Sequence, residues 1–154
     1  MTPETFAARI GEWGRGTMIA GHGTRFVSAG QGRAEAHLDF KPELTQLTGL
    51  FHAGAIIALA DETATAAAMW ETNPTGEFRP ELFPLTLHMS ANLIRNTNHG
   101  TLVAEAEIVH RGRTTLVVDV RVSDAERRLI AKFVATLLAP TVPTGSVPAD
   151  RPGR

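Results

Sequence analysis

The stretch His52-Ala-Gly-Ala-Ile-Ile-Ala-Leu-Ala-Asp-Glu-Thr-Ala-Thr-Ala-Ala-Ala-Met-Trp-Glu-Thr72 decides the fold that this sequence predicts. It is rich in alanine, the residue with the highest intrinsic helix propensity. Apolar residues occupy most sides of the helix that it would form, and such a helix is normally buried on most sides. Small side chains would let a β-sheet approach closely. We therefore expect one long buried helix from His52 to about Thr72.

Segments with the alternation of β-strands lie on both sides of this helix. Before it, we expect a glycine-punctuated strand near 24–29 and a half-buried strand over 33–40, joined by a turn at Gly30-Gln31-Gly32. After it come four strand-like runs, over 85–94, 101–109, 114–123 and 129–138. Their spacing of about a dozen residues is typical of an antiparallel meander.

The order of the elements predicts the fold class. A short helix over Pro3–Trp13, with Thr2 as its cap, precedes the first strand. Helix, two strands, long buried helix and four strands make an α+β protein, in which a curved antiparallel sheet of about six strands wraps around the central helix. We expect a single domain over 1–139, with the N-terminal helix inside 1–15, and a disordered tail rich in proline and glycine over 140–154.

Composition excludes several functional classes. The 154 residues are 43% hydrophobic, which fits one globular domain. The 15 Lys and Arg against 16 Asp and Glu give a net charge of −1, so a broad basic surface for nucleic acid is not expected. Because the sequence has no cysteine, disulfides, cysteine nucleophiles and cysteine-ligated metal sites are excluded.

No stretch of the sequence predicts targeting or insertion into a membrane. The N-terminus lacks the long apolar core of a secretory signal. The longest apolar stretch, 53–70, contains Asp61 and Glu62, whereas a membrane helix needs about 20 nearly uncharged residues. We expect a cytoplasmic protein that binds neither membranes nor nucleic acid. The sequence also lacks the motifs of serine hydrolases, P-loop NTPases and HExxH zinc proteases.

Three positions on the central helix are candidates for chemistry. The first N–H groups of a helix have no internal partner and lie at its positive end, so the N–H of Ala53 is a candidate oxyanion donor, although any helix start offers such donors. A carboxylate such as Asp61 is costly to bury in an apolar helix unless it is paired or useful. Thr65 lies one turn further on the same face, and the two are suited to hold and deprotonate a water molecule. The alternative is that Asp61 faces solvent or bonds a neighbouring strand.

These residues resemble the pattern of the hotdog-fold acyl-CoA thioesterases, in the group of the 4-hydroxybenzoyl-CoA and phenylacetate-pathway thioesterases. That pattern is an Asn or Gln, a His-Gly-Gly that begins six positions later and opens the helix, and then Leu-Ala followed by an acid. Here it reads Gln46, His52-Ala53-Gly54 and Leu59-Ala60-Asp61, without gaps. The resemblance covers about residues 21–139. The sequence departs from the pattern at Ala53, where the first glycine is usual, and at Arg95-Asn96, where Arg-Pro is usual.

The resemblance implies roles by position. Gln46 would polarise or position the thioester carbonyl, and the N–H of Ala53 would hold the oxyanion. Asp61 would be the general base or the nucleophile, with Thr65 in support. Thr86, on the strand after the helix, corresponds to a Ser or Thr of the family that helps to orient water.

Further residues would bind the substrate. His52 and Gly54 belong to the helix start, where His52 fits the role of fixing the helix better than that of a base. Arg111 and Arg113 lie at a hairpin near which relatives meet the phosphates of coenzyme A, and arginine suits phosphate geometry. The alternative for these two arginines is a solvated hairpin tip.

Other charged residues have structural interpretations. Glu62 points about 100° away from the preceding acid around the helix, and we expect it to contact a strand. A shift of the alignment by one position would exchange the roles of the two acids. The charged turn over 124–128 is interpreted as a solvated cluster.

The spacing on the helix predicts a dimer. Ala53 and Asp61 are eight residues apart, ~12 Å along a helix that rises ~1.5 Å per residue. A thioester carbonyl must lie within ~3 Å of both its oxyanion donor and its attacking water, which one helix cannot achieve. Two antiparallel copies of the helix can place both groups at one carbonyl. The resemblance also implies a homodimer, or a dimer of dimers, with strands paired edge to edge and sites shared between subunits. It implies no metal or redox cofactor, and coenzyme A only as part of the substrate.

The expected activity is hydrolysis of the thioester of a small aryl- or acyl-CoA. A hotdog hydratase or dehydratase is disfavoured. Those enzymes resemble one another in having an Asp followed five residues later by a His, and this sequence has Ala66 at that position. The other alternative is a non-catalytic acyl-CoA-binding protein. The acid at Asp61 counts against it, since such proteins typically lose that acid.

Overall fold

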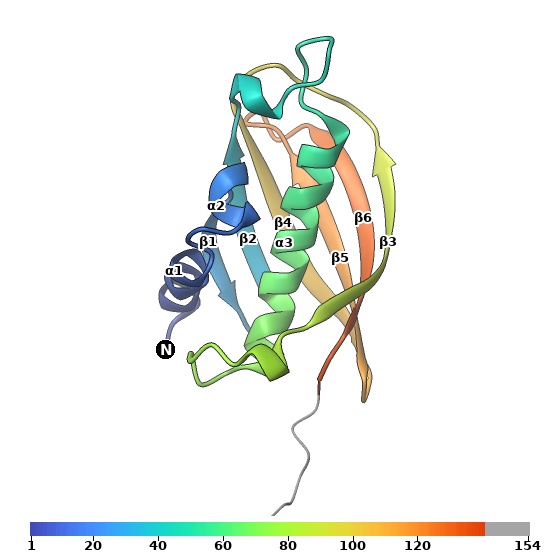
Figure 1. The fold of residues 1–154 in the computed structure, drawn as a ribbon. Coiled ribbons are helices and arrows are strands. Elements are labelled where there is room, and N and C mark those ends of the chain that lie inside the picture. The colour runs from blue at the N-terminus through green and yellow to red at the C-terminus, as the bar shows by residue number, and fades with distance from the viewer. Residues whose placement is uncertain (141–154) are drawn as a thin grey trace, which may run out of the picture.

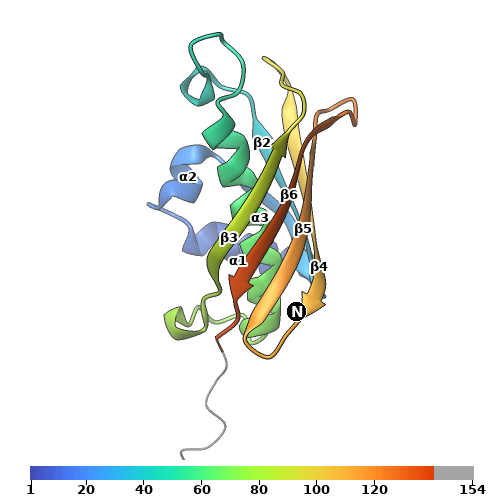
Figure 2. The same ribbon diagram turned by 90° about the vertical axis from the view of Figure 1, so that its right-hand side faces the viewer.

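A 20-residue helix, α3 (Ala53–Thr72), lies against one face of a six-stranded antiparallel sheet in the computed structural model of the chain (Figures 1 and 2). The sheet curves around the helix, as the sequence predicts. The structure describes residues 1–140. Of the tail expected to be disordered, all but Pro140 lies outside the described residues.

The strands follow the predicted segments closely. They are β1 (Arg25–Gly30), β2 (Arg33–Asp39), β3 (Leu85–Leu93), β4 (Thr101–Arg111), β5 (Thr115–Ser123) and β6 (Leu129–Leu138). Between β1 and β2, Gln31 and Gly32 both have positive φ, 55° and 76°, which is the backbone of a two-residue type I′ hairpin. The alternation in β5 buries Leu116, Val118, Val120 and Val122 against the helix side of the sheet.

The strand order corrects the expected meander. Across the sheet it is β1-β2-β4-β5-β6-β3, so β3 pairs with β6 and not with β4. The connection over 94–100 is longer than a hairpin loop. It is anchored to residues that precede α3, because the Phe51 N–H donates to the Thr97 carbonyl (3.1 Å) and the Phe40 N–H donates to the Gly100 carbonyl (2.8 Å). The chain therefore crosses the N-terminal end of α3, and β4 lies beside β2 (Figure 1).

The helix at the N-terminus is confirmed, and further helical segments were not expected. Helix α1 (Pro3–Trp13) is capped by Thr2, whose Oγ1 accepts the Thr5 N–H at 3.2 Å. It lies against β1, where a side chain on Gly30 would come within 2.9 Å of Pro3. Three helical segments are not predicted by the sequence pattern: the short helix α2 (Met18–His22) and the 3-10 turns η1 (Pro42–Leu44) and η2 (Pro80–Leu82).

The core fills the space between α3 and the sheet. The helix contributes small side chains that are fully buried, among them Ala60, Ala64 and Ala67, so the sheet packs close to its backbone. Phe51 and Phe133 are among the large buried side chains that fill the remaining space. In the part of the chain that the structure describes, no helix combines the length and the apolar character needed to cross a bilayer.

Candidate active site

One stripe of α3 is left uncovered by the sheet of its own chain. It contains the exposed Gly54 and Ile57 and the half-buried Ala58, Asp61 and Thr65, which follow the three- and four-residue spacing of one helix face. The other sides of α3 pack against the core. The stripe explains how a carboxylate is accommodated in an apolar helix, because Asp61 keeps contact with solvent.

Asp61 is held by a residue from the neighbouring strand. The hydroxyl of Thr86 on β3 donates a hydrogen bond of 2.6 Å to Oδ1 of Asp61. The register of β3 against β6 shifts between Thr86 and His88, with Leu87 as the extra residue. The structure thus brings together two of the residues singled out in the sequence. Oδ1 is occupied by the hydroxyl, and no protein donor within residues 1–140 bonds Oδ2, which leaves this oxygen available for a water or a substrate.

Thr65 lies one turn beyond Asp61 on the same stripe and is half-buried. Within the described residues, no hydrogen bond joins the two side chains. The threonine that bonds the acid is therefore Thr86 from the strand, and Thr65 flanks the site.

The start of α3 has the geometry of an anion-binding helix end. His52 is the N-cap, and its Nδ1 accepts the N–H of Gly54 at 2.8 Å. A side chain on Gly54 would approach His52 Nδ1 to 3.0 Å, so glycine at this position permits the cap. The N–H of Ala53 has no acceptor among residues 1–140, as expected for the first residue of a helix. His52 occupies the role of fixing the helix start.

Gln46 lies in the loop that leads into this helix. The loop is closed by the Gln46 N–H donating to the Leu50 carbonyl (2.9 Å) and by a β-bridge between Thr45 and Phe51. The Gln46 side chain is half-buried, and its Nε2 donates to Thr48 Oγ1 at 2.8 Å. Among residues 1–140, Thr48 is the one acceptor of this amide group, which has a second N–H.

Open space borders the helix start on both sides of His52. One hollow of about 240 Å³ lies toward α2 and is lined by Met18, His22, Glu43, Leu44, Thr45, His52, Gly54 and Ala55. A second, of about 530 Å³, is lined by Thr45, Gln46, Leu47, Thr48 and His52. A ligand bound at the helix start therefore has room in two directions.

Glu62 contacts a helix and not a strand, which corrects the expectation. Its Oε2 lies 3.5 Å from Nδ1 of His22 at the end of α2, and the two side chains are 11% and 4% exposed. His22 Nδ1 also bonds Thr24 Oγ1 at 2.9 Å. The partner was missed because α2 was missed: a five-residue helix between glycines has too short a pattern to be recognised. Glu62 is thus turned away from Asp61.

Arg111 and Arg113 lie at the far end of the molecule from the helix start. Arg111 Nη2 is 3.3 Å from Oε1 of Glu71, in the last turn of α3, and Arg113 is exposed. Glu71 is ten residues beyond Asp61, about 15 Å along the helix. Within one chain, the structure does not bring these arginines together with Asp61 or Ala53.

Comparison with known proteins gives one family. A sequence model of the thioesterase superfamily matches residues 48–131, which include α3 and most of the sheet. A protein of Mycobacterium tuberculosis with the provisional name of an esterase is 31% identical over 110 residues, 71% of this chain and 76% of that protein. Its solved structure is similar with a TM-score of 0.73 at 28% identity and covers 82% of this chain and 98% of that one.

The names of two further similar proteins mention coenzyme A or one of its thioesters. The 1,4-dihydroxy-2-naphthoyl-CoA hydrolase of Listeria monocytogenes is 26% identical over 108 residues, which are 70% of this chain and 83% of that enzyme. The structure of a hypothetical thioesterase of Streptococcus pneumoniae with coenzyme A has a TM-score of 0.67 at 22% identity, covering 75% of this chain and 84% of that one. At that identity the likeness shows the fold.

Proposed function

The chain belongs to the thioesterase superfamily and is a thioester hydrolase with the hotdog fold, and from this premise we propose that it hydrolyses acyl-CoA thioesters at a site shared by two subunits. The similarity to a naphthoyl-CoA hydrolase and to a thioesterase with coenzyme A supports this class of substrate. The observation that carries the proposal is the hydrogen bond from Thr86 to Asp61, because it orients a carboxylate on the uncovered stripe of α3.

The carboxylate and the oxyanion donor come from different subunits. Along one α3, the N–H of Ala53 and Asp61 are separated by about 12 Å, too far to act on one carbonyl. Two copies of α3 lying antiparallel set Ala53 of each copy beside Asp61 of the other. A two-fold axis then makes two equivalent sites.

The free edge of the sheet supports such a dimer. Eight of the nine residues of β3 are exposed, and an uncovered edge strand offers unpaired backbone groups to another strand. Large apolar side chains on and just after this strand are 45–58% exposed: Leu85, Leu87, Leu93 and Ile94. Pairing of β3 with a second β3 would cover them and bring the two α3 stripes together.

The reaction follows from the groups present. The carbonyl oxygen of the thioester accepts the Ala53 N–H, with the Gln46 amide as a second donor. Asp61 takes a proton from a water that attacks the carbonyl carbon, and the negative charge that develops on oxygen is stabilised at the helix start. Collapse of the tetrahedral intermediate breaks the C–S bond and releases a carboxylic acid, while the proton on Asp61 passes to the coenzyme A thiolate. Attack by Asp61 itself, through an anhydride that water then cleaves, uses the same positions. Neither route needs a metal or a redox cofactor.

The test compares the two adjacent acids. D61N should lower kcat/KM for the best acyl-CoA by roughly 100-fold or more, because it removes the general base. E62Q alters the neighbouring acid, which contacts His22 outside the stripe. It should stay within a few-fold of wild type. Release of free thiol from a panel of aryl- and acyl-CoAs gives the rates. Full turnover by D61N, or its loss in E62Q alone, would assign the chemistry to another residue.

A further inference from the structure

An apolar hollow of about 300 Å³ lies between the two N-terminal helices and the second half of α3. Large apolar side chains from α1, α2, α3 and the segment before β3 form its walls, among them Trp13, Met18, Ile19, Met69, Phe78 and Phe83. Of the described residues that line it, Thr17 alone carries a hydroxyl, which already donates to the Gly14 carbonyl at 2.6 Å. The hollow therefore suits a hydrocarbon group and offers little to a polar one.

The edge of this hollow is open to solvent. Met18 is 68% exposed and Phe78 is 45% exposed, although both side chains are large and apolar. The ring centroids of Trp13 and Phe78 lie 5.5 Å apart, and those of Phe78 and Phe83 lie 6.3 Å apart. Exposed apolar side chains beside a preformed aromatic wall are typical of a ligand site, because a ligand that enters covers them.

One row of residues on α3 leads from Asp61 to the hollow. Asp61, Thr65 and Met69 follow each other at intervals of four residues, and each step advances about 6 Å along the helix and turns about 40° around it. The turn is toward the side of Glu62, which contacts His22 on α2. Met69 is part of the wall of the hollow. A chain attached to a carbonyl carbon beside Asp61 can therefore pass Thr65 and enter it.

The hollow lies on the side of α3 that the proposed dimer leaves open. In Figure 1, α2 and β3 lie on opposite sides of α3, and the partner subunit is proposed to pair with β3. The match to the family model begins at residue 48, whereas Trp13, Met18 and Ile19 belong to α1 and α2. One wall of the hollow is thus supplied by a part of this chain that the family model does not match.

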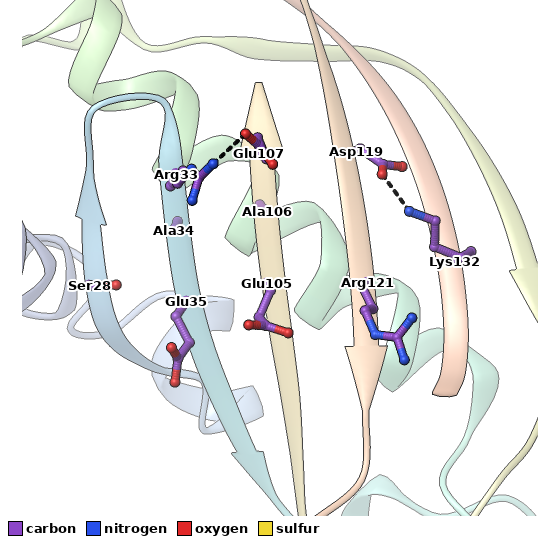
Figure 3. A pocket seen from close by; sticks show the side chains of 10 residues that line it. All are labelled: Ser28, Arg33, Ala34, Glu35, Glu105, Ala106, Glu107, Asp119, Arg121 and Lys132. Carbon is purple, nitrogen blue, oxygen red and sulfur yellow. Dashed lines mark hydrogen bonds and ion pairs between the residues drawn. The ribbon is translucent and has the colours of Figure 1, made fainter. Parts of the chain in front are cut away.

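A second hollow, on the other face of the sheet, is unsuited to a hydrocarbon chain. It has about 400 Å³ and is lined mostly by charged side chains, among them Glu105, Arg121 and Lys132 (Figure 3). Along β5, Arg121 alternates with Val120 and Val122, which are buried on the side of the helix. The sheet therefore separates this charged hollow from Asp61.

We propose that the apolar hollow, called the acyl hollow below, receives the tail of a straight-chain acyl-CoA. This inference rests on the proposed function, since it takes the thioester carbonyl to lie beside Asp61. Eight residues separate Asp61 from Met69, about 12 Å along the helix, and an extended chain of ~1.5 Å bonds advances ~1.25 Å per carbon. About ten carbons therefore reach Met69, and the substrates are acyl groups of about eight to twelve carbons. A benzoyl group is shorter and would end near Thr65.

Hydrolysis rates for saturated acyl-CoAs of increasing length test the acyl hollow. In the wild type, kcat/KM should rise between butanoyl-CoA and decanoyl-CoA by about four-fold for each methylene that enters the hollow, and should then level off. Because the hollow is remote from the carbonyl, the rise should appear mainly as a lower KM.

Three variants test whether this hollow causes the dependence on chain length. I19W fills the hollow from α2, and F78D places a carboxylate in its exposed wall. Each should lower the ratio of kcat/KM for decanoyl-CoA to that for butanoyl-CoA by about ten-fold or more. V134W is the matched control, because Val134 is apolar, 41% exposed and lies on the face of β6 that points away from α3. It should keep the ratio of the wild type.

Three kinetic results would overturn the acyl hollow. They are a kcat/KM that does not rise with chain length, a higher kcat/KM for benzoyl-CoA than for decanoyl-CoA, and a wild-type ratio in both I19W and F78D. Circular dichroism checks that each variant folds, and the ratio compares two substrates on the same protein preparation.

Binding of decanoate distinguishes failure of the acyl hollow from failure of the proposed function. Trp13 lines the hollow, so decanoate should shift the tryptophan emission of the wild type. The shift should be lost in W13F, which keeps Trp70 as its one tryptophan. If no acyl-CoA is hydrolysed and decanoate still shifts the Trp13 emission, the proposed function fails and the acyl hollow stands. If acyl-CoAs are hydrolysed and decanoate leaves the emission unchanged, the acyl hollow fails and the proposed function stands.

Discussion

Thr86 and Asp61 meet at 2.6 Å although 25 positions separate them in the sequence and they belong to a strand and a helix. The contact exists because β3 lies at the end of the sheet beside β6, where its first residues reach the uncovered stripe of α3.

Removing the hydroxyl at Thr86 should slow the reaction without weakening binding. T86V removes a hydrogen bond to a charged group, an interaction of about 1.5–3 kcal/mol, so kcat should fall roughly ten-fold or more while KM stays nearly constant. T86S keeps the hydroxyl and should retain most of the activity. Steady-state kinetics of thiol release measures both constants. Equal kcat for T86V and wild type would show that Asp61 needs no support from β3.

Proline at position 53 should remove the oxyanion donor while preserving the helix. Proline is favoured at the first position of a helix, and His52 already has φ −66° and ψ 135°, a conformation that suits a residue before proline. Loss of this N–H should lower kcat about 100- to 1000-fold in A53P. A53G keeps the N–H and is the control. If A53P turned over like A53G, with both folded by circular dichroism, the oxyanion would have to be held elsewhere.

Two inactive variants should restore activity when mixed. In a dimer of one D61N subunit and one A53P subunit, the intact Ala53 of the first faces the intact Asp61 of the second. Unfolding and refolding an equal mixture should therefore recover about a quarter of wild-type activity, because half of the dimers are mixed and each has one complete site. If both residues acted within one chain, the mixture would stay inactive, since no subunit has both.

Asp124 should make stability depend on acid pH. Burial alone would raise its pKa, but hydrogen bonds from the N–H groups of Arg128 and Glu126 and from the Arg128 guanidinium outweigh burial and hold the pKa below its ordinary value of 3.8. A lowered pKa in the folded state contributes stability above the unfolded value, and this is lost as the pH falls below about 3.8. Asp124 is 4% exposed whereas residues 125–128 are exposed, so the expected solvated cluster is confirmed for the rest of the turn and wrong for Asp124.

Thermal unfolding of D124N measures this contribution. At pH 7 the melting temperature should be a few degrees lower than in the wild type, and the difference should shrink as the pH falls through the acid range. A constant difference between pH 7 and pH 3 would mean that the Asp124 charge does not stabilise the turn. The same thermal unfolding of D39N compares this buried carboxylate with an exposed one. The pKa of Asp39 is also lowered, by hydrogen bonds from Thr101 and Arg25.

Local patterns in the sequence were sufficient for the strands, the two longer helices and part of the site. Helix α3 is a run of alanine and apolar residues, and the eight-residue spacing of Ala53 and Asp61 on it is a property of the helix alone. The alternation in β2 and β5 predicts which side chains are buried, because neighbouring side chains of a strand point to opposite faces. Gln46 and Thr86 entered through resemblance to a family, since nothing in their own neighbourhoods marks them.

Only the tertiary structure decided which elements lie side by side. Three examples are the place of β3 beside β6, the contact of Glu62 with His22 and the pairing of Arg111 with Glu71, which join residues 38 or more positions apart. Helix and strand periods depend on residues only a few positions apart, so they can be recognised directly in the sequence. Strand order and side-chain partners depend on how whole elements pack and where a connecting segment is anchored, and no local pattern carries that information.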